Sequence, residues 1–158
     1  MQLKLTQKER MLLEDQKKHE QICIEKYTNY ANQAQCPQLK QLFNNHAQLE
    51  RTHLDTINQL LSGNIPQMNQ QQNQGTTQNT GNQNTGNTQQ FTGTTKDTDM
   101  CTDMLMTEKY VSGAYNTAIF EFTNPQVRDV LNHIQKEEQK HGEAIFKYME
   151  SKGLYNAQ

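Results

Sequence analysis

Charged side chains are missing from one long stretch of this 158-residue chain, because none occurs from Thr56 to Thr95. Most of that stretch is Gln, Asn, Thr and Gly, with almost nothing apolar. Such a segment cannot bury enough surface to offset the entropy lost on ordering. We therefore predict a disordered linker over residues 64–96, which separates a first part, residues 1–63, from a second part, residues 97–158.

Long apolar runs and an excess of positive charge are also missing. The N-terminal "MQLKLTQKERMLL" has no apolar core of a signal peptide, and no run approaches the roughly 20 residues of a membrane span. The formal net charge is -2, so the sequence lacks the excess of positively charged residues that is typical of nucleic-acid-binding proteins. We expect cytoplasmic synthesis without a signal peptide, and neither a membrane nor a nucleic acid as partner.

Cysteine is scarce, with three residues at Cys23, Cys36 and Cys101 and no CxxC pair. An odd, scattered set argues against an internal disulfide framework and suits a reducing compartment. The sequence favours core or surface thiols over the alternative of cross-links between chains.

The first part is patterned as two helices. Thr6 and Glu9 form a T-x-x-E capping box that predicts the start of the first helix. "QCPQL" interrupts the pattern, and Pro37 suits the first position of a second helix that ends before "SGNIP". Apolar residues at helical spacing predict the buried face of the second helix: Leu39, Leu42, Phe43, His46, Leu49, His53, Ile57 and Leu60.

The second part repeats this plan. "TNPQV" separates two more helical patterns, with Asn124 as the N-cap and Pro125 at the first helical position. Lys152 and Gly153 supply the stop signal of the last helix. The methionines at 100, 104 and 106 are read as packing residues.

A shift of 88 residues superposes the two parts without a gap. Glu20 falls on Glu108, and Pro37 falls on Pro125. The other matches are Tyr27 on Tyr115, Asn44 on Asn132, Glu50 on Glu138, His53 on His141 and Ile57 on Ile145. Two copies of one helical hairpin predict an all-α four-helix bundle, in which the two hairpins form one domain.

Each part contains the pattern E-x29-E-x-x-H, and its members lie on the apolar faces of their helices. The six residues are Glu20, Glu50, His53, Glu108, Glu138 and His141. Four carboxylates in a core are costly without compensating charge. One Glu from each of two helices and one Glu-x-x-His from each of the others is the ligand set of ferritin-like di-iron and di-manganese proteins. We predict two metal ions, with Glu50 and Glu138 as bridges and Glu20 and Glu108 as terminal ligands.

Carboxylate and imidazole ligands suit iron first and manganese second, with zinc as a competitor. Tyr27 and Tyr115 are either core aromatics or hydrogen-bond donors to the ligands. His46 lies one turn before Glu50 but aligns with Ile134, which favours a packed core histidine. The pattern places His19 and His133 on the surface. It assigns Glu121 and Glu137 to positions that face solvent or a partner.

The order of features in "EQICIEKYTNYANQAQCPQLKQLF…LERTHL" resembles rubrerythrin and other ferritin-like proteins. The second part is similar to a narrower group, the spore coat protein F family of endospore-forming bacteria. The matching features are "EKYVSGAYNTAIFE", "NPQVRDVL", the "EEQKH" run and "YMESKGLY". This resemblance implies a small ferritin-like bundle in the spore coat, although the long linker and the complete ligand set in both parts depart from a plain coat module.

Two functions follow as hypotheses. The first is a spore-coat-associated di-metal protein with a protective redox role, for which the sequence leaves enzymatic turnover open. The alternative is a structural coat component with a metal-free or purely structural site. Expected partners are other coat proteins or a second copy of the chain, since the linker can cross one bundle or reach a neighbour in a swapped dimer. A cage-forming or DNA-protecting ferritin is disfavoured because the chain has no basic tail.

Overall fold

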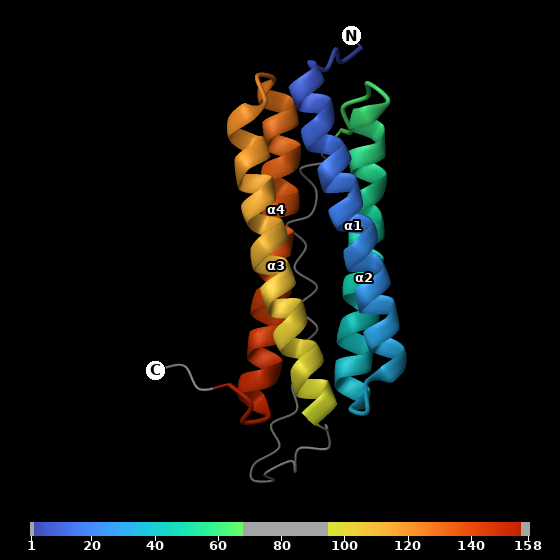
Figure 1. The fold of residues 1–158 in the computed structure, drawn as a ribbon, viewed down its shortest axis with the longest axis vertical. Helices are drawn as coiled ribbons and strands as arrows, with labels where there is room; N and C mark the ends of the chain where they lie inside the picture. The colour runs from blue at the N-terminus through green and yellow to red at the C-terminus, as the bar shows by residue number, and fades with distance from the viewer. Residues whose placement is uncertain (1, 68–94, 156–158) are drawn as a thin grey trace.

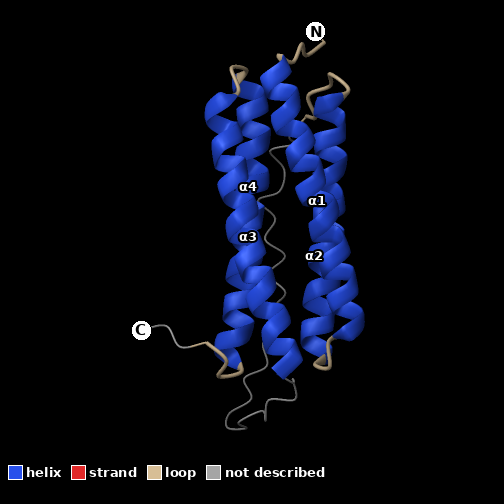
Figure 2. Cartoon of the chain, viewed as in Figure 1, coloured by secondary structure: helices blue, strands red, loops and turns tan. Residues whose placement is uncertain are grey.

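The computed structural model describes residues 2–67 and 95–155. Over these residues the chain forms four helices and no strand (Figures 1 and 2). The helices are α1 (Gln7–Gln33), α2 (Pro37–Leu61), α3 (Thr95–Glu121) and α4 (Pro125–Ser151). The predicted all-α fold built from two helical hairpins is confirmed.

The predicted helix starts are confirmed by their hydrogen bonds. The Thr6 hydroxyl accepts from Glu9 N at 3.1 Å, while the Glu9 carboxylate accepts from Thr6 N at 2.9 Å, which is the reciprocal capping box. The Asn124 side chain caps α4 by accepting from the backbone N–H groups of the two residues after Pro125. Local sequence signals therefore define these helix starts.

The two hairpins pack side by side, with α1 against α3 and α2 against α4 (Figure 1). The end of α2 lies beside the N-terminus, where Leu3 N donates to Gly63 O. The start of α3 lies at the opposite end of the bundle, beside the turn between α1 and α2, where Asp97 binds the backbone of Gln35. The connection from α2 to α3 therefore joins opposite ends of the bundle. Most of the predicted linker, residues 64–96, lies outside the described residues, and Thr95 and Lys96 already belong to α3.

The core follows the predicted faces with two exceptions. Leu49 was expected to be buried but is 41% exposed, and Met106 was expected to pack in the bundle but is 63% exposed. Each of these side chains lies at the edge of the buried face of its helix. The buried face covers only part of the circumference of an amphipathic helix, so residues at its edge meet solvent. The three cysteines are buried, which favours the core-thiol interpretation.

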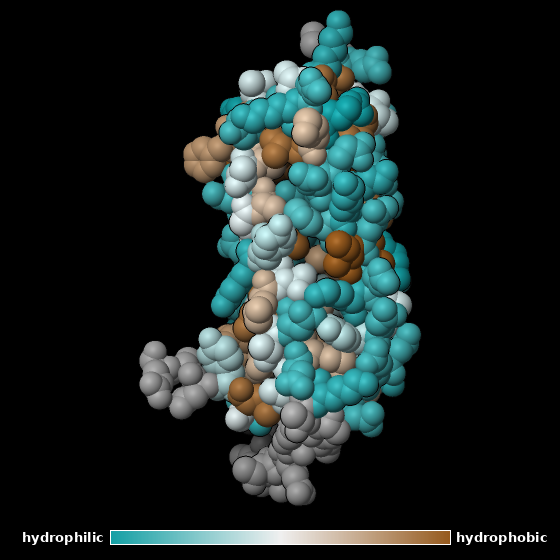
Figure 3. All heavy atoms as spheres, viewed as in Figure 1, coloured by the Kyte–Doolittle hydropathy of each residue, from teal (hydrophilic) through white to brown (hydrophobic). Residues whose placement is uncertain are grey.

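The face of the bundle seen in Figure 3 is largely hydrophilic, with small apolar groups over α1 and α3. In the part of the chain that the structure describes, no helix has the combination of length and apolar composition needed to cross a membrane. The unusual feature is inside the bundle, where acidic and imidazole side chains interrupt the apolar core.

Candidate metal centre

All six predicted ligand residues meet at mid-height in the bundle core. Each helix contributes to the cluster: α1 brings Glu20, α3 brings Glu108, and α2 and α4 each bring a Glu–His pair. Every one of the six residues is at most 2% exposed. The i, i+3 spacing within α2 and α4 places each Glu and its His on one helix surface, which the sequence pattern anticipates.

The ligand atoms form two overlapping groups. Glu20, Glu50, His53 and Glu138 offer atoms that all lie within 4.8 Å of one another. Glu50, Glu108, Glu138 and His141 form a second group on the same criterion. Because Glu50 and Glu138 belong to both groups, the geometry suits two adjacent cations that share these carboxylates.

Both histidines direct Nδ1 toward the shared carboxylates. His53 Nδ1 lies 3.0 Å from Glu138 Oε1 and 3.2 Å from Glu50 Oε2. His141 Nδ1 lies 2.9 Å from Glu50 Oε1. The same nitrogen of each imidazole therefore faces the position where the two groups meet.

Burial and mutual contacts shift the pKa values of three cluster residues, Glu20, Glu108 and His141, in the direction that favours bound protons. Burial and the neighbouring Glu50 carboxylate raise the pKa of Glu20 well above its usual value. Burial and a hydrogen bond with Glu138 raise the pKa of Glu108 to about 8. Burial alone would lower the pKa of His141, but its carboxylate acceptors raise it to about 11. Cations that bind here would displace these protons and take over the compensation of charge.

Several buried atoms in the cluster still have no hydrogen-bond partner among the described residues. They are Glu20 Oε2, Glu108 Oε2, Glu138 Oε2 and His141 Nε2. Two of these oxygens still lie near an imidazole, because Glu20 Oε2 is 3.8 Å from His53 Nδ1 and Glu138 Oε2 is 3.4 Å from His141 Nδ1. A buried polar atom without a hydrogen bond calls for a partner such as water or an ion. Four carboxylates and two imidazoles are also the ligand types that iron and manganese accept. The buried atoms without hydrogen bonds and the types of ligand present both fit a pair of divalent metal ions.

Two tyrosines hold the outer carboxylates across the bundle. Tyr27 of α1 donates to Glu108 Oε1, and Tyr115 of α3 donates to Glu20 Oε1, each at 2.5 Å. Each tyrosine therefore donates a hydrogen bond to a carboxylate of the other hairpin. This arrangement matches the hydrogen-bonding alternative for these tyrosines, and both rings are also fully buried core aromatics.

Glu137 was assigned to solvent or a partner, and this prediction is wrong. Its Oε2 lies 3.1 Å from His53 Nε2, and the hydrogen bond with His53 lowers the pKa of Glu137. A carboxylate on the outer nitrogen of a ligand histidine orients the ring and fixes its tautomer. The residue at the repeat-related position is the exposed Leu49, so the 88-residue alignment gave no signal for this contact.

The remaining singled-out residues lie close to their predicted positions. His46 is a buried core histidine stacked on His141, with ring centroids 4.1 Å apart, and burial together with His141 lowers its pKa to about 2. Glu121 forms a surface ion pair with Lys8, and the half-exposed His133 pairs with Glu137. His19 is partly buried and meets the ring of Tyr110 edge to face.

Comparison with protein families gives a match over the second hairpin. Residues 96–158 match the family model described as the Coat F domain. Comparisons with curated proteins and with solved structures return no match.

Proposed function

We propose that this chain is a spore-coat-associated, ferritin-like protein that holds two metal ions between its four buried glutamates and two histidines. The observation that carries the proposal is that two ligand groups share Glu50 and Glu138. The Coat F match over residues 96–158 supports the location in the coat. The parallel α2–α3 pair, which needs a connection along the whole bundle, supports the ferritin-like comparison.

Iron or manganese, when bound, would supply a redox centre able to react with dioxygen or peroxide, which suits a protective role in a dormant cell. The side chains of the protein would position the two ions and supply the negative charge that binds them. Glu50 and Glu138 would lie between the two ions, while Tyr27 and Tyr115 orient the outer carboxylates by hydrogen bonds. The nearly complete burial of all six ligands limits the access of bulk water.

Metal analysis of the full chain tests the proposal directly. Protein produced in medium supplemented with iron and manganese is expected to contain about two ions per chain. The measurement is elemental analysis by mass spectrometry after removal of loosely bound metal. A content below about 0.2 ions per chain would contradict the proposal, because a site with this ligand set and burial should retain its metal through purification.

One observation favours the second candidate, a structural coat component without turnover. The pKa values of Glu20, Glu108 and both histidines are all raised, which favours bound protons that offset negative charge in the cluster without a metal. The bundle could then fold without metal. A metal-poor but fully folded protein would support this candidate.

Glu137 provides a finer test of the centre. Glu137→Gln keeps a hydrogen-bond acceptor but loses the charge that stabilises the His53 ring, so metal affinity is expected to fall by about tenfold. Competition titration with a chelating indicator measures the affinity. Glu150→Gln is the matched control, because Glu150 is an exposed carboxylate on the same helix. Equal affinities for the two variants would show that Glu137 does not support the site.

A further inference from the structure

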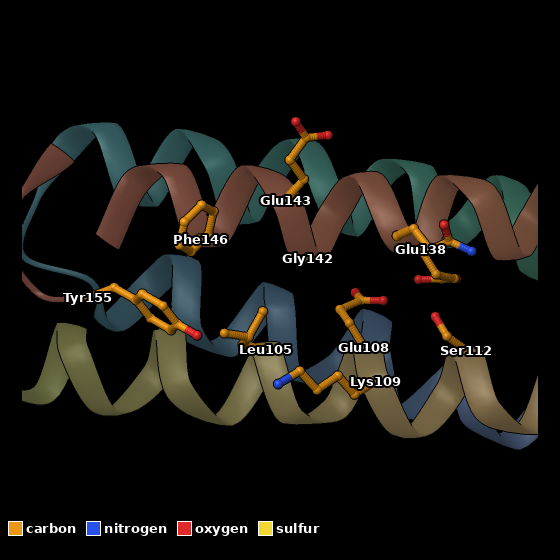
Figure 4. Close-up of a pocket in the computed structure, with 10 residues that line it drawn as sticks. Leu105, Glu108, Lys109, Ser112, Glu138, Gly142, Glu143, Phe146 and Tyr155 are labelled. Atoms are coloured by element: carbon orange, nitrogen blue, oxygen red, sulfur yellow. The ribbon is translucent and has the colours of Figure 1, made fainter. Parts of the chain in front are cut away.

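The groove between α3 and α4 holds a cavity of about 550 Å³ that lies beside Gly142 (Figure 4). Leu105 and Phe146 form apolar parts of its wall, and the carboxylates of Glu108 and Glu138 form a polar part. Both carboxylates are already assigned to the metal ions, so this cavity belongs to the candidate metal centre. The outward-facing sides of α1 and α3 carry a separate feature.

Exposed apolar side chains are concentrated on these two helices. Among residues 2–67 and 95–155, seven large hydrophobic residues are exposed, and five of them belong to α1 or α3. The five residues, each between 48% and 83% exposed, are Met11, Ile22, Met106, Tyr110 and Phe120. The two helices lie side by side, and apolar groups are visible over both (Figures 1 and 3). Apolar side chains gathered on one side of a hydrophilic surface indicate contact with another protein.

On α3 the exposed apolar residues belong to one stripe, which we call the α3 stripe. Its five residues are all exposed and follow one another at spacings of four, three, four and three residues: Met106, Tyr110, Gly113, Thr117 and Phe120. This spacing keeps residues on one face of a helix and is the spacing at which two helices pack together. Met106 and Phe120 are equally distant from Gly113, where the missing side chain allows a second helix to approach closely.

A shorter stripe on α1, the α1 stripe, has the same kind of symmetry. Its four residues are exposed and follow one another at spacings of four, three and four residues: Met11, Asp15, Lys18 and Ile22. Apolar residues lie at both ends, and an acidic and a basic residue lie between them. When a second copy of the stripe runs in the opposite direction, Asp15 faces Lys18 and Met11 faces Ile22. The α1 stripe is therefore complementary to itself in the antiparallel arrangement.

The centres of the two stripes lie at the same height in the bundle. Three contacts define the register of α1 against α3: Lys8 with Glu121, His19 with Tyr110, and Lys26 with Asp103. From one contact to the next, the step along α1 equals the step along α3 in the opposite direction. Residues 16–17, the middle of the α1 stripe, therefore lie level with residues 112–113, the middle of the α3 stripe. A single two-fold axis can pass over both centres, as a symmetric dimer requires.

The size of this face suits a contact between two copies of the chain. A large aromatic side chain carries about 200 Å² of surface, so the five apolar residues together expose on the order of 600 Å². A stable complex buries about 800 Å² on each partner, which these residues and the polar residues between them can supply. The carboxylates of Asp103 and Glu121 are already paired with lysines of α1, so they add no uncompensated charge to the face.

A groove of about 290 Å³ lies between the two stripes, and its lining includes Ile22, Met106 and Tyr110. The two-fold arrangement brings Met11 of a second copy opposite Ile22 and brings Phe120 of that copy opposite Met106. Both of these apolar side chains then lie over the groove and can fill it. Aromatic residues and methionine are enriched at the buried centres of protein interfaces, which fits this composition.

We propose that this chain forms a two-fold symmetric dimer in which the α1 and α3 stripes pack antiparallel against the same stripes of a second copy. Gly113 lies at the centre of the interface, and Met106 packs against Phe120 of the second copy. Asp15 pairs with Lys18 of the second copy. Metal binding is not needed for this contact, because the six ligand residues lie inside the bundle.

Sedimentation velocity of the full chain is expected to show a dimer whose dissociation constant is about 10 µM or lower. Gly113→Glu should raise this constant at least about thirtyfold, because two identical carboxylates would meet at the axis. The variant should fold, since a Cβ at Gly113 meets nothing within 4 Å and Glu is a better helix former than Gly. Gln48→Glu is the matched control, because it adds the same charge at an exposed position of α2, outside both stripes.

An exchange of charges tests the antiparallel pairing itself. Asp15→Lys alone and Lys18→Asp alone should each weaken the dimer by about tenfold, because each opposes like charges across the axis. The two substitutions together restore opposite charges and should return the dissociation constant to within about threefold of wild type. A wild-type chain that stays monomeric at about 100 µM would overturn the inference. Equal dimerisation of Gly113→Glu and wild type, or a double exchange that restores nothing, would overturn it as well.

Discussion

Adding Mn²⁺ to metal-free protein is expected to raise the free energy of unfolding by about 4 kcal/mol for each ion bound, when free metal is about 1,000 times the dissociation constant of that site. The reason is that the ions bind the folded cluster, while the unfolded chain does not assemble four carboxylates and two imidazoles. Urea unfolding with and without Mn²⁺, followed by circular dichroism, measures the change.

The double variant Glu50→Gln with Glu138→Gln is the control for this result. It removes the two carboxylates that both ligand groups share, so the gain on adding Mn²⁺ should fall below about 1 kcal/mol. The stability of the metal-free variant is measured first, so that any change in the bundle itself is known. An equal gain in both proteins would place metal binding elsewhere on the chain.

Asp97→Ala is expected to destabilise the bundle by about 3 kcal/mol. The Asp97 carboxylate, at the start of α3, is fully buried and accepts from the backbone N–H groups of Gln35 and Cys36, each at 2.9 Å. These donors precede α2, whose N-cap residue Cys36 makes no side-chain capping bond. Ala would leave both donors without this acceptor and loosen the contact between the hairpins. Urea denaturation of wild type and variant measures the loss.

Asp99→Ala is the matched control for Asp97, because it removes an exposed carboxylate from the same first turns of α3. It should change the stability by less than about 0.5 kcal/mol. Similar losses in the two variants would mean that the general charge at the start of α3 matters and that the bonds across the hairpins do not.

Much of the fold could be predicted because its signals are local. The capping box at Thr6, the prolines at 37 and 125 and the apolar periodicity lie within a few residues of the features they specify. The 88-residue repeat then related the two hairpins and indicated six inward-facing ligand residues. The structure brings these six together, while the presence and identity of the metal stay predictions.

The contacts between helices could not be predicted in the same way. Periodicity indicates which face of a helix is buried, but a position at the edge of that face contacts whatever the neighbouring helix presents at that height. Glu137 and Leu49 occupy equivalent edges in the repeat, yet one binds His53 and the other meets solvent.

The amino-acid sequence alone was sufficient to predict the helices, their pairing into two similar hairpins and the residues of the inner cluster. Each of these features depends on the spacing of residues along one chain segment. Three features became visible only in the packing of the helices against one another. They are the two ligand groups that share Glu50 and Glu138, the contact of Asp97 with the other hairpin and the cavity beside Gly142. These features depend on the distance and register between helices that are far apart in the sequence. No local pattern carries that information, because it arises only when side chains from different helices fill a common space.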